Sequence, residues 1–383
     1  MRATRGLGLR LAKRSRVLKL SATCLIFALA AFVYFTGVLE ERDAEVAGVA
    51  AALGEVESTG VMKGIEDEPG GDTAPPADAR RDCRVEAVFI DGRESEAALA
   101  VLTSVLEFVP QVCITVYLGH RTMLPWGLKL RDDVYEAGRQ LLGGAQPVDF
   151  RVEVLHRKFL IRGEKVQVGH LLSHPWFWDE TNRSGEFVLT VQTDTVLCQK
   201  LDINAYDGYA YIGAPWAKNV ACALPEKIAD WQKVATDRGE AGPLDAERAG
   251  CVYVGNGGLS LRRNDWMRRA LAVCPFTQWA EEVGGELGVE PSSFKCLATK
   301  YLEDQWFATI LYSLGAPMPS KEDAYRFSIE QPWPIVNLDG MTEDEIKTLV
   351  PVGVHKTWNY AGEEVVQHLR NVCKYFDAIH PPK

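Results

Sequence analysis

The first residue that could do chemistry is an aspartate that directly follows an apolar run. Residues 186–191 predict a buried strand, and Asp194 comes just after it, where an acidic side chain is not needed for packing. A carboxylate in that place could hold a divalent metal ion, the usual means of neutralising the charge that develops on a departing diphosphate. An aspartate after a strand is also common as a turn residue or helix cap. Taken alone, Asp194 leaves both interpretations open.

A glycine-rich segment is the second candidate. Residues 255–258 are Gly-Asn-Gly-Gly, followed by a short alternating stretch and a predicted helix start at Asn264. Three glycines within four residues allow the main chain to approach a ligand closely and to adopt positive φ. A plain turn would use the same residues, so the segment indicates a binding site only together with other polar signals.

Two adjacent acids form the third candidate. Glu303 and Asp304 precede an amphipathic helix predicted over residues 305–311. Acids in the first turn of a helix are favourable by about 0.3–1 kcal/mol, which is the structural interpretation. The functional interpretation is a general base that deprotonates an acceptor hydroxyl. A glycan hydrolase with paired carboxylates is not favoured, because adjacent side chains on a helix diverge by about 100°.

The fourth candidate lies near the carboxyl terminus, where His355 and Lys356 stand together, two residues before Trp358. A neutral histidine is a good metal ligand, and a lysine suits a diphosphate. On an exposed loop the same pair would be unremarkable.

The elements that must position these residues begin with a strand, a helix and a strand. Residues 85–90 predict a strand, residues 99–109 carry a helical apolar pattern, and residues 112–118 predict a second strand. This spacing is typical of a parallel βαβ unit, in which ligands bind beyond the carboxyl ends of the strands. Asp91 and Arg93 therefore fall at the binding edge.

The remaining chain continues the alternation of strands and helices. Residues 150–155 predict a third strand and residues 165–173 a helix before the strand at 186–191. Residues 218–248 resemble an insertion or mobile loop, and there is no internal repeat. The pattern predicts a single α/β domain.

The N-terminal fifth divides into a basic tail (residues 1–19), an apolar run (20–39) and a Pro/Gly-rich polar stretch (40–82) ahead of the domain (83–383). About 20 apolar residues span a bilayer core of about 30 Å, whereas a cleaved signal has an apolar core of roughly 7–15. We therefore expect a signal anchor and a flexible stem, with the domain in the lumen of the Golgi or another secretory compartment, a single-pass type II topology. Cleavage after Ala28-Leu29-Ala30 is the alternative.

Composition limits the class of protein. The chain has 383 residues, 47% hydrophobic and 25% charged, which is ordinary for a globular protein. Its net charge of −10 argues against nucleic acid as a partner. Of nine cysteines, Cys24 lies in the apolar run; the other eight permit disulfides of undetermined connectivity, with Cys113 a possible buried free thiol. Asn182 begins a glycosylation sequon.

Taken in order, the short motifs resemble an uncharacterised glycosyltransferase-like domain family found in fungi, algae, bacteria and large viruses. The resemblance covers roughly residues 85–358. It rests on Leu171-Leu172, Phe177-Trp178, Phe187-Val188-Leu189 with Gln192-Thr193-Asp194, residues 211–216 (Tyr-Ile-Gly-Ala-Pro-Trp), residues 255–262 (Gly-Asn-Gly-Gly-Leu-Ser-Leu-Arg), Glu303-Asp304 and His355-Lys356-x-Trp358. Members look like nucleotide-sugar transferases of the GT-A type, with one α/β domain and a mostly parallel central sheet.

The resemblance implies a role for each candidate. Asp194 corresponds to the last Asp of the family's Asp-x-Asp motif, and Gln192 stands where the first Asp would be. Asp194 and His355 would together hold Mn²⁺ or Mg²⁺ against the diphosphate of the donor. The other implied roles are the nucleotide base or ribose for Asp91 and Arg93, the diphosphate for Lys356, the donor sugar and acceptor for Gly257 and Gly258, and the catalytic base for Asp304, with Glu303 beside it.

The expected function is transfer of a sugar from a nucleotide-sugar donor to a glycan or glycoconjugate acceptor, with inversion of configuration; retention is compatible with the same residues. The alternative is a non-catalytic lumenal glycan-binding or scaffold protein that kept the fold and lost the complete metal motif, as Gln192 suggests. The identity of the sugar depends on pocket contacts that loops supply.

Overall fold

The computed structural model describes residues 83–91, 94–141, 143, 149–161, 165–166, 168–179, 183, 185–217, 221–222, 229, 233, 251–275 and 302–382. Contacts divide the chain into residues 1–73 and 74–383, and every described residue belongs to the second unit. The predicted tail, anchor, cleavage site, stem and sequon asparagine lie outside the described residues. Within the described ranges, no helix combines the length and the apolar character needed to cross a membrane.

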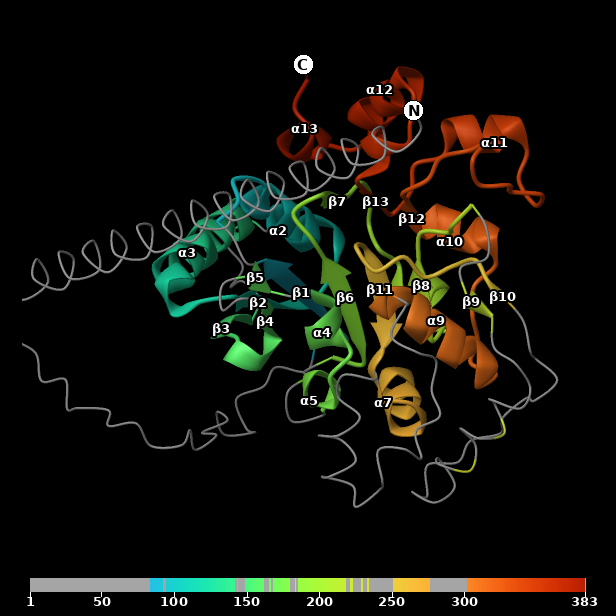
Figure 1. Ribbon diagram of the computed structural model, residues 1–383. Coiled ribbons are helices and arrows are strands. Elements are labelled where there is room, and N and C mark those ends of the chain that lie inside the picture. Colours follow the sequence, from blue (N-terminus) through green and yellow to red (C-terminus); the bar gives the residue numbers. More distant parts are fainter. Residues whose placement is uncertain are drawn as a thin grey trace, which may run out of the picture. The chain divides into compact units, whose positions relative to one another are not determined.

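A six-stranded central sheet organises this unit (Figure 1). Its strands, in spatial order, are β3 (Phe150–Val154), β2 (Val112–Leu118), β1 (Val85–Asp91), β6 (Phe187–Val191), β11 (Ser260–Arg263) and β8 (Tyr211–Gly213). The first four run parallel, and β11 is antiparallel to both of its neighbours. The predicted α/β class with a largely parallel sheet is confirmed, as is the βαβ unit at its start.

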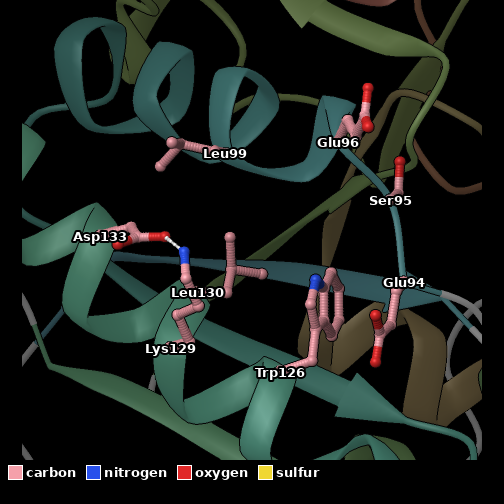
Figure 2. Close-up of a pocket in the computed structure, with 8 residues that line it drawn as sticks. All are labelled: Glu94, Ser95, Glu96, Leu99, Trp126, Lys129, Leu130 and Asp133. Atoms are coloured by element: carbon pink, nitrogen blue, oxygen red, sulfur yellow. Dashed lines mark hydrogen bonds and ion pairs between the residues drawn. The ribbon is translucent and has the colours of Figure 1, made fainter.

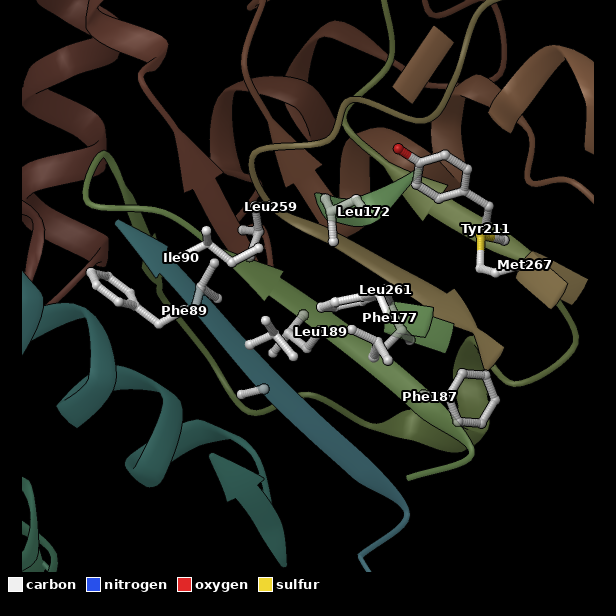
Figure 3. Packing of buried hydrophobic residues seen from close by; sticks show 14 of the residues in the cluster. Phe89, Ile90, Leu172, Phe177, Phe187, Leu189, Tyr211, Leu259, Leu261 and Met267 are labelled. Atoms are coloured by element: carbon white, nitrogen blue, oxygen red, sulfur yellow. The ribbon is translucent and has the colours of Figure 1, made fainter. Parts of the chain in front are cut away.

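Strands β2 and β6 form because their residues are largely apolar on both faces. Every residue of β2 and β6 is buried, as expected of strands that helices cover on both sides. Figure 1 shows α2 (Ala97–Phe108) and α3 (Leu124–Leu141) beside the β1–β3 half of the sheet. Figure 3 shows Leu172, Phe177 and Met267 packed around Leu189 and Leu261 at the other half. These three come from α4 (Val168–Leu172), α5 (Pro175–Trp178) and α7 (Asn264–Val273).

A second sheet has three strands, one of which directly follows β6 in the sequence. Its order is β12 (Ser328–Ile329), β13 (Gly353–His355) and β7 (Thr195–Leu197). It has its own apolar cluster, to which α12 (Glu363–Val372) and α13 (Phe376–Ile379) contribute. A disulfide between Cys198 and Cys373, with an S–S distance of 2.05 Å, joins the end of β7 to the end of α12.

The other described elements are short, apart from α9. They are the 3-10 turns η3 (Arg121–Met123), η4 (Arg157–Phe159), η5 (Ile203–Ala205) and η8 (Thr357–Asn359), the helices α9 (Glu303–Ser313), α10 (Lys321–Phe327) and α11 (Glu343–Thr348), and the strand pairs β4 (Leu160–Ile161) with β5 (Lys165–Val166) and β9 (Ala221–Cys222) with β10 (Cys251–Val252).

Two sequence predictions need correction. The helix expected over residues 165–173 is limited to α4, because Lys165–Val166 pairs with β4 instead. Cys113 is not a free thiol, since it is bonded to Cys83. The parallel register that sets Val85 beside Val112 also brings these two cysteines together. Of the insertion expected at 218–248, only residues 221–222, 229 and 233 are described.

Candidate metal and catalytic site

The turn between the two sheets carries Asp194. Residues 192–194 connect the carboxyl end of β6 to β7, and Thr195 closes the turn. Its hydroxyl donates to the carbonyl of Gln192 at 2.7 Å and accepts the N–H of Gln192 at 3.1 Å. Asp194 thus lies where the sequence predicted it, beyond the end of a buried parallel strand, and the hydroxyl of Thr195 fixes the path of the chain around it.

The register of β7 with β13 brings His355 to Asp194. The antiparallel pairing sets Thr195 opposite His355, and the N–H of Lys356 donates to the carbonyl of Asp194 at 2.9 Å. As a result, Nε2 of His355 lies 3.4 Å from Oδ1 of Asp194. Asp194 and His355, far apart in the sequence, are therefore adjacent because their strands pair, and their contact does not depend on long side chains.

The glycine segment packs directly on this pair. A Cβ at Gly258 would lie 2.2 Å from Nε2 and Cε1 of His355, a distance that only glycine avoids. A Cβ at Gly257 would lie 3.0 Å from the Cβ of Asp304, and the N–H of Gly257 donates to Oδ2 of Asp304 at 3.1 Å. The glycines therefore allow main chain to approach both the histidine and the acid of α9.

Asp194 and His355 could supply two ligands to a divalent metal ion. Oδ1 of Asp194 and both ring nitrogens of His355 are buried, and none of them has a hydrogen-bond partner in the structure. Burial raises the pKa of Asp194, but the contact with His355 and the charges of His355 and Lys356 outweigh it, so the pKa lies below the ordinary value. An ionised oxygen and an imidazole nitrogen 3.4 Å apart fit a divalent ion. No group of three or more potential ligand side chains occurs among the described residues.

Glu330, which the sequence analysis missed, lies behind the histidine. It follows β12 directly and is 4% exposed. Its Oε1 is 3.5 Å from Nδ1 of His355 and 3.4 Å from Nζ of Lys356, and its Oε2 accepts a hydrogen bond from Nδ2 of Asn256 at 2.6 Å. Burial raises the pKa of Glu330, against the opposing charges of His355 and Lys356. The strand before it, β12, has two residues and is too short to give a sequence pattern. The one available signal for this site residue was an acid directly after Ser328-Ile329.

The acidic pair at the start of α9 divides between two partners. Glu303 is ion-paired with Arg262, whose guanidinium is fully buried and lies 4.6 Å from the ring of Tyr211. Burial raises the pKa of Glu303 to about 7. Asp304 instead accepts the N–H groups of Gly257 and Gln305, and burial raises its pKa as well. Of the two acids, Asp304 is therefore the one in contact with the glycine segment.

The two candidates at the end of β1 lie largely outside the described residues. Asp91 ends β1, but its side chain and the whole of Arg93 lie outside the described residues. Gln192 is half-buried in the turn, and none of the hydrogen bonds described involves its side-chain amide.

A groove of about 530 Å³ opens just after β1, between α2 and α3 (Figure 2). Trp126 and Leu130 form its apolar part, and Lys129 and Asp133 pair at 2.6 Å on its side. The other lining residues are Glu94, Ser95, Glu96 and Leu99. It follows the strand at whose end the sequence analysis expected the nucleotide.

The fold and the site together define a mixed α/β protein with a carboxylate–imidazole pair at the carboxyl ends of its parallel strands. Residues 149–355, more than half of the chain, match the sequence model of a family described as "Protein of unknown function (DUF5672)". The chain belongs to this family. The match includes Asp194, the glycine segment, the acids of α9, Glu330 and His355. Comparison with curated proteins gives no match.

Several similar solved structures are glycosyltransferases. Mouse xyloside xylosyltransferase 1 in its apo form is 12% identical with a TM-score of 0.35, over 74% of this chain and all of the other. The galactosyltransferase LgtC, solved with donor and acceptor sugar analogues, is 15% identical with a TM-score of 0.36, over 73% and 87% of the two chains. GlyE of Streptococcus pneumoniae TIGR4 is 13% identical with a TM-score of 0.40, over 79% and 61%. Similarities this low carry no argument about donor, acceptor or mechanism.

Proposed function

We propose that this protein is a glycosyltransferase that moves a sugar from a nucleotide-sugar donor to a glycan or glycoconjugate acceptor, with the help of a divalent metal ion. The observation that carries the proposal is the pairing of Asp194 with His355, 3.4 Å apart at the carboxyl end of β6, with buried ligand atoms that have no hydrogen-bond partner. Oxygen and imidazole donors suit Mn²⁺ and Mg²⁺, which keep waters and take further oxygens from a substrate.

Asp194 and His355 would hold the ion, and the ion when bound supplies positive charge for a departing diphosphate. The chain adds a fixed charge of its own beside it. The side chain of Lys356 is one-third exposed, and its Nζ lies 3.4 Å from Oε1 of Glu330, which orients the ammonium group close to the metal pair. The left-handed conformation of Lys356, with φ of 33°, lets the chain turn sharply immediately after His355.

Asp304 is the proposed general base. It accepts the N–H of Gly257 at 3.1 Å, beside the glycine segment, and burial raises its pKa, the direction that favours proton acceptance. Glu303 is held by Arg262 inside the protein and so keeps the start of α9 in place. Attack by an acceptor hydroxyl on the anomeric carbon from the side opposite the diphosphate would invert the configuration of the sugar.

The proposal includes an N-terminal signal anchor at residues 20–39 and a lumenal domain in the Golgi or another secretory compartment, on the sequence of residues 1–82 alone. Protease treatment of sealed vesicles checks it: the domain should be protected until detergent is added. Digestion in intact vesicles would refute this topology.

The decisive experiment measures nucleotide release by the detergent-solubilised full chain against a panel of sugar nucleotides, with Mn²⁺, Mg²⁺ or EDTA. One donor should give metal-dependent release that Asp194→Ala abolishes. Asp132→Ala is the matched control, because that carboxylate is exposed and, among the described residues, pairs with its neighbour Arg131 alone. Release by Asp194→Ala at the wild-type rate contradicts the proposal. Absence of both release and metal-dependent nucleotide binding favours the non-catalytic glycan-binding alternative.

A further inference from the structure

The imidazole of His355 lies between two carboxylates. Its Nε2 faces Asp194 at 3.4 Å and its Nδ1 faces Glu330 at 3.5 Å. The cause is again backbone register. The parallel pairing of β12 with β13 sets Ile329 beside Val354, so that the next residues, Glu330 and His355, continue side by side. The ring itself is only 2% exposed, so the protein and not the solvent decides which nitrogen carries the proton.

In the neutral form that can bind a metal ion, the imidazole of His355 has one N–H and one lone pair. Whichever nitrogen lacks the proton directs its lone pair at a carboxylate oxygen, which is unfavourable. The side chain of Asp194 is 37% exposed, so a metal ion from solvent can bind it and relieve the repulsion there, whereas that of Glu330 is 5% exposed and already has Nζ of Lys356 3.4 Å from its Oε1. The lower-energy arrangement therefore has the proton on Nδ1, toward Glu330.

We propose that Glu330 is a positioning residue that accepts a hydrogen bond from Nδ1–H of His355 and so keeps Nε2 free, toward Asp194, for a metal ion. The inference rests on the metal-binding part of the proposed function. A carboxylate behind a ligating histidine fixes its tautomer and orientation, and loss of such a partner typically costs 10–100-fold in metal affinity.

Glu330 is itself held in place. Its second oxygen accepts from Nδ2 of Asn256 at 2.6 Å, and Oδ1 of Asn256 accepts the N–H of Gly258 at 2.9 Å. Gly258 in turn packs on the ring of His355. The imidazole of His355 therefore faces Glu330 with Nδ1 and contacts Gly258 with its ring atoms. Asn256 hydrogen-bonds to both Glu330 and Gly258 and so links these two residues.

This chain of contacts makes Glu330→Gln an informative variant. A glutamine that kept its carbonyl toward Nδ1 would turn its NH₂ toward Asn256. The Asn256 amide would then have to flip, and its NH₂ would meet the N–H of Gly258. The variant must therefore lose either the proposed hydrogen bond from His355 or the bond that holds the glycine segment. Glu330→Met, which has a similar volume and no acceptor oxygen at this position, removes the contact outright.

The first test is Mn²⁺ affinity of the full chain in detergent, measured by isothermal titration calorimetry, with thermal unfolding as the check on folding. Glu330→Gln and Glu330→Met should each bind Mn²⁺ 10–100-fold more weakly than the wild type. Glu364→Gln is the control, since that glutamate is exposed on α12, and its affinity should not change. Wild-type affinity in both folded Glu330 variants overturns the inference.

The second test is the tautomer, read from long-range ¹⁵N–¹H NMR of histidine-labelled protein without metal, with the His355 signal assigned by its loss in His355→Gln. The wild type should have Nδ1 protonated, and the Glu330 variants should shift toward the Nε2-protonated form. Wild-type protein with Nε2 protonated contradicts the inference whatever its activity. If no metal binds but the tautomer shifts as stated, the positioning role stands while the metal-assisted function fails.

Discussion

Two regions at the binding edge of the sheet differ in how their side chains are held. Asp194 and His355 are fixed by strand register and buried contacts, and they lie within the matched span 149–355. The groove between α2 and α3 precedes that span, and its charged residues are largely exposed; Lys129 and Asp133 pair within one helix. Atomic positions at the first region are set by backbone pairing, whereas those at the second depend on side chains that are largely exposed to solvent. Substitutions should therefore cost much at the first and little at the second.

The largest effect is expected from Asp304→Asn. The amide keeps the size of the side chain but cannot accept a proton, so kcat should fall by about 10²–10⁴-fold while donor binding changes little. Steady-state kinetics together with calorimetric titration of the donor nucleotide separate the two quantities. Equal losses in kcat and in donor affinity would assign Asp304 to donor binding and would contradict its role as the general base.

A second effect concerns the buried pair beneath the same region. Burial raises the pKa of Glu303 to about 7 from its ordinary 4.5, so the folded protein binds this proton more tightly than the unfolded chain. The contribution to stability is therefore present below pH 4.5 and is lost as the pH rises toward 7, about 3 kcal/mol in all. Urea unfolding from pH 4.5 to 8 should show this decline in the wild type and a flatter profile in Glu303→Gln. Parallel profiles would contradict it.

Gly258→Ala tests the backbone approach directly. The added methyl would lie 2.2 Å from ring atoms of His355 and must displace either the ring or the glycine segment. A displacement of about 1 Å commonly costs about 10²-fold in rate. Nucleotide release should fall by that factor, and Mn²⁺ affinity should fall with it. Gly208→Ala is the matched control, because a Cβ at that position meets no atom within 4 Å. Unchanged release in Gly258→Ala would show that the histidine is not held where the site needs it.

The four parallel strands of the sheet could be predicted, most clearly those at residues 112–118 and 187–191, which are buried on both faces and appear as apolar runs. The antiparallel strands β11 and β8, of four and three residues, were not predicted. The place of Asp194 followed from the end of its strand. The failures have a common cause in short elements. The hairpin of β4 and β5 has two residues in each strand, too few for a period to be visible.

The contact between Asp194 and His355 could not be derived from the sequence, where only the family resemblance linked them. It depends on pairing between two three-residue strands, β7 and β13. Glu330 was missed for the same reason, since its place is set by the register of β12. Likewise, the disulfides follow from strand register and packing, and cysteine spacing does not reveal these. Tertiary pairing of short strands therefore decides the site after local pattern has decided the sheet.

The smallest effect is expected in the groove between α2 and α3, and it tests directly whether the groove is separate from the site at Asp194. Lys129→Ala removes an exposed i,i+4 pair with Asp133, which should lower the free energy of unfolding by only about 0.3–0.5 kcal/mol. Urea unfolding measures that change. Nucleotide release should stay within a factor of about two, because water screens the charge of an exposed lysine and leaves it little electrostatic effect on a ligand. A tenfold loss of donor affinity in this variant, with stability unchanged, would mean that the donor binds across the groove. The binding edge would then extend from Asp194 to α3, and the two regions would be parts of one site.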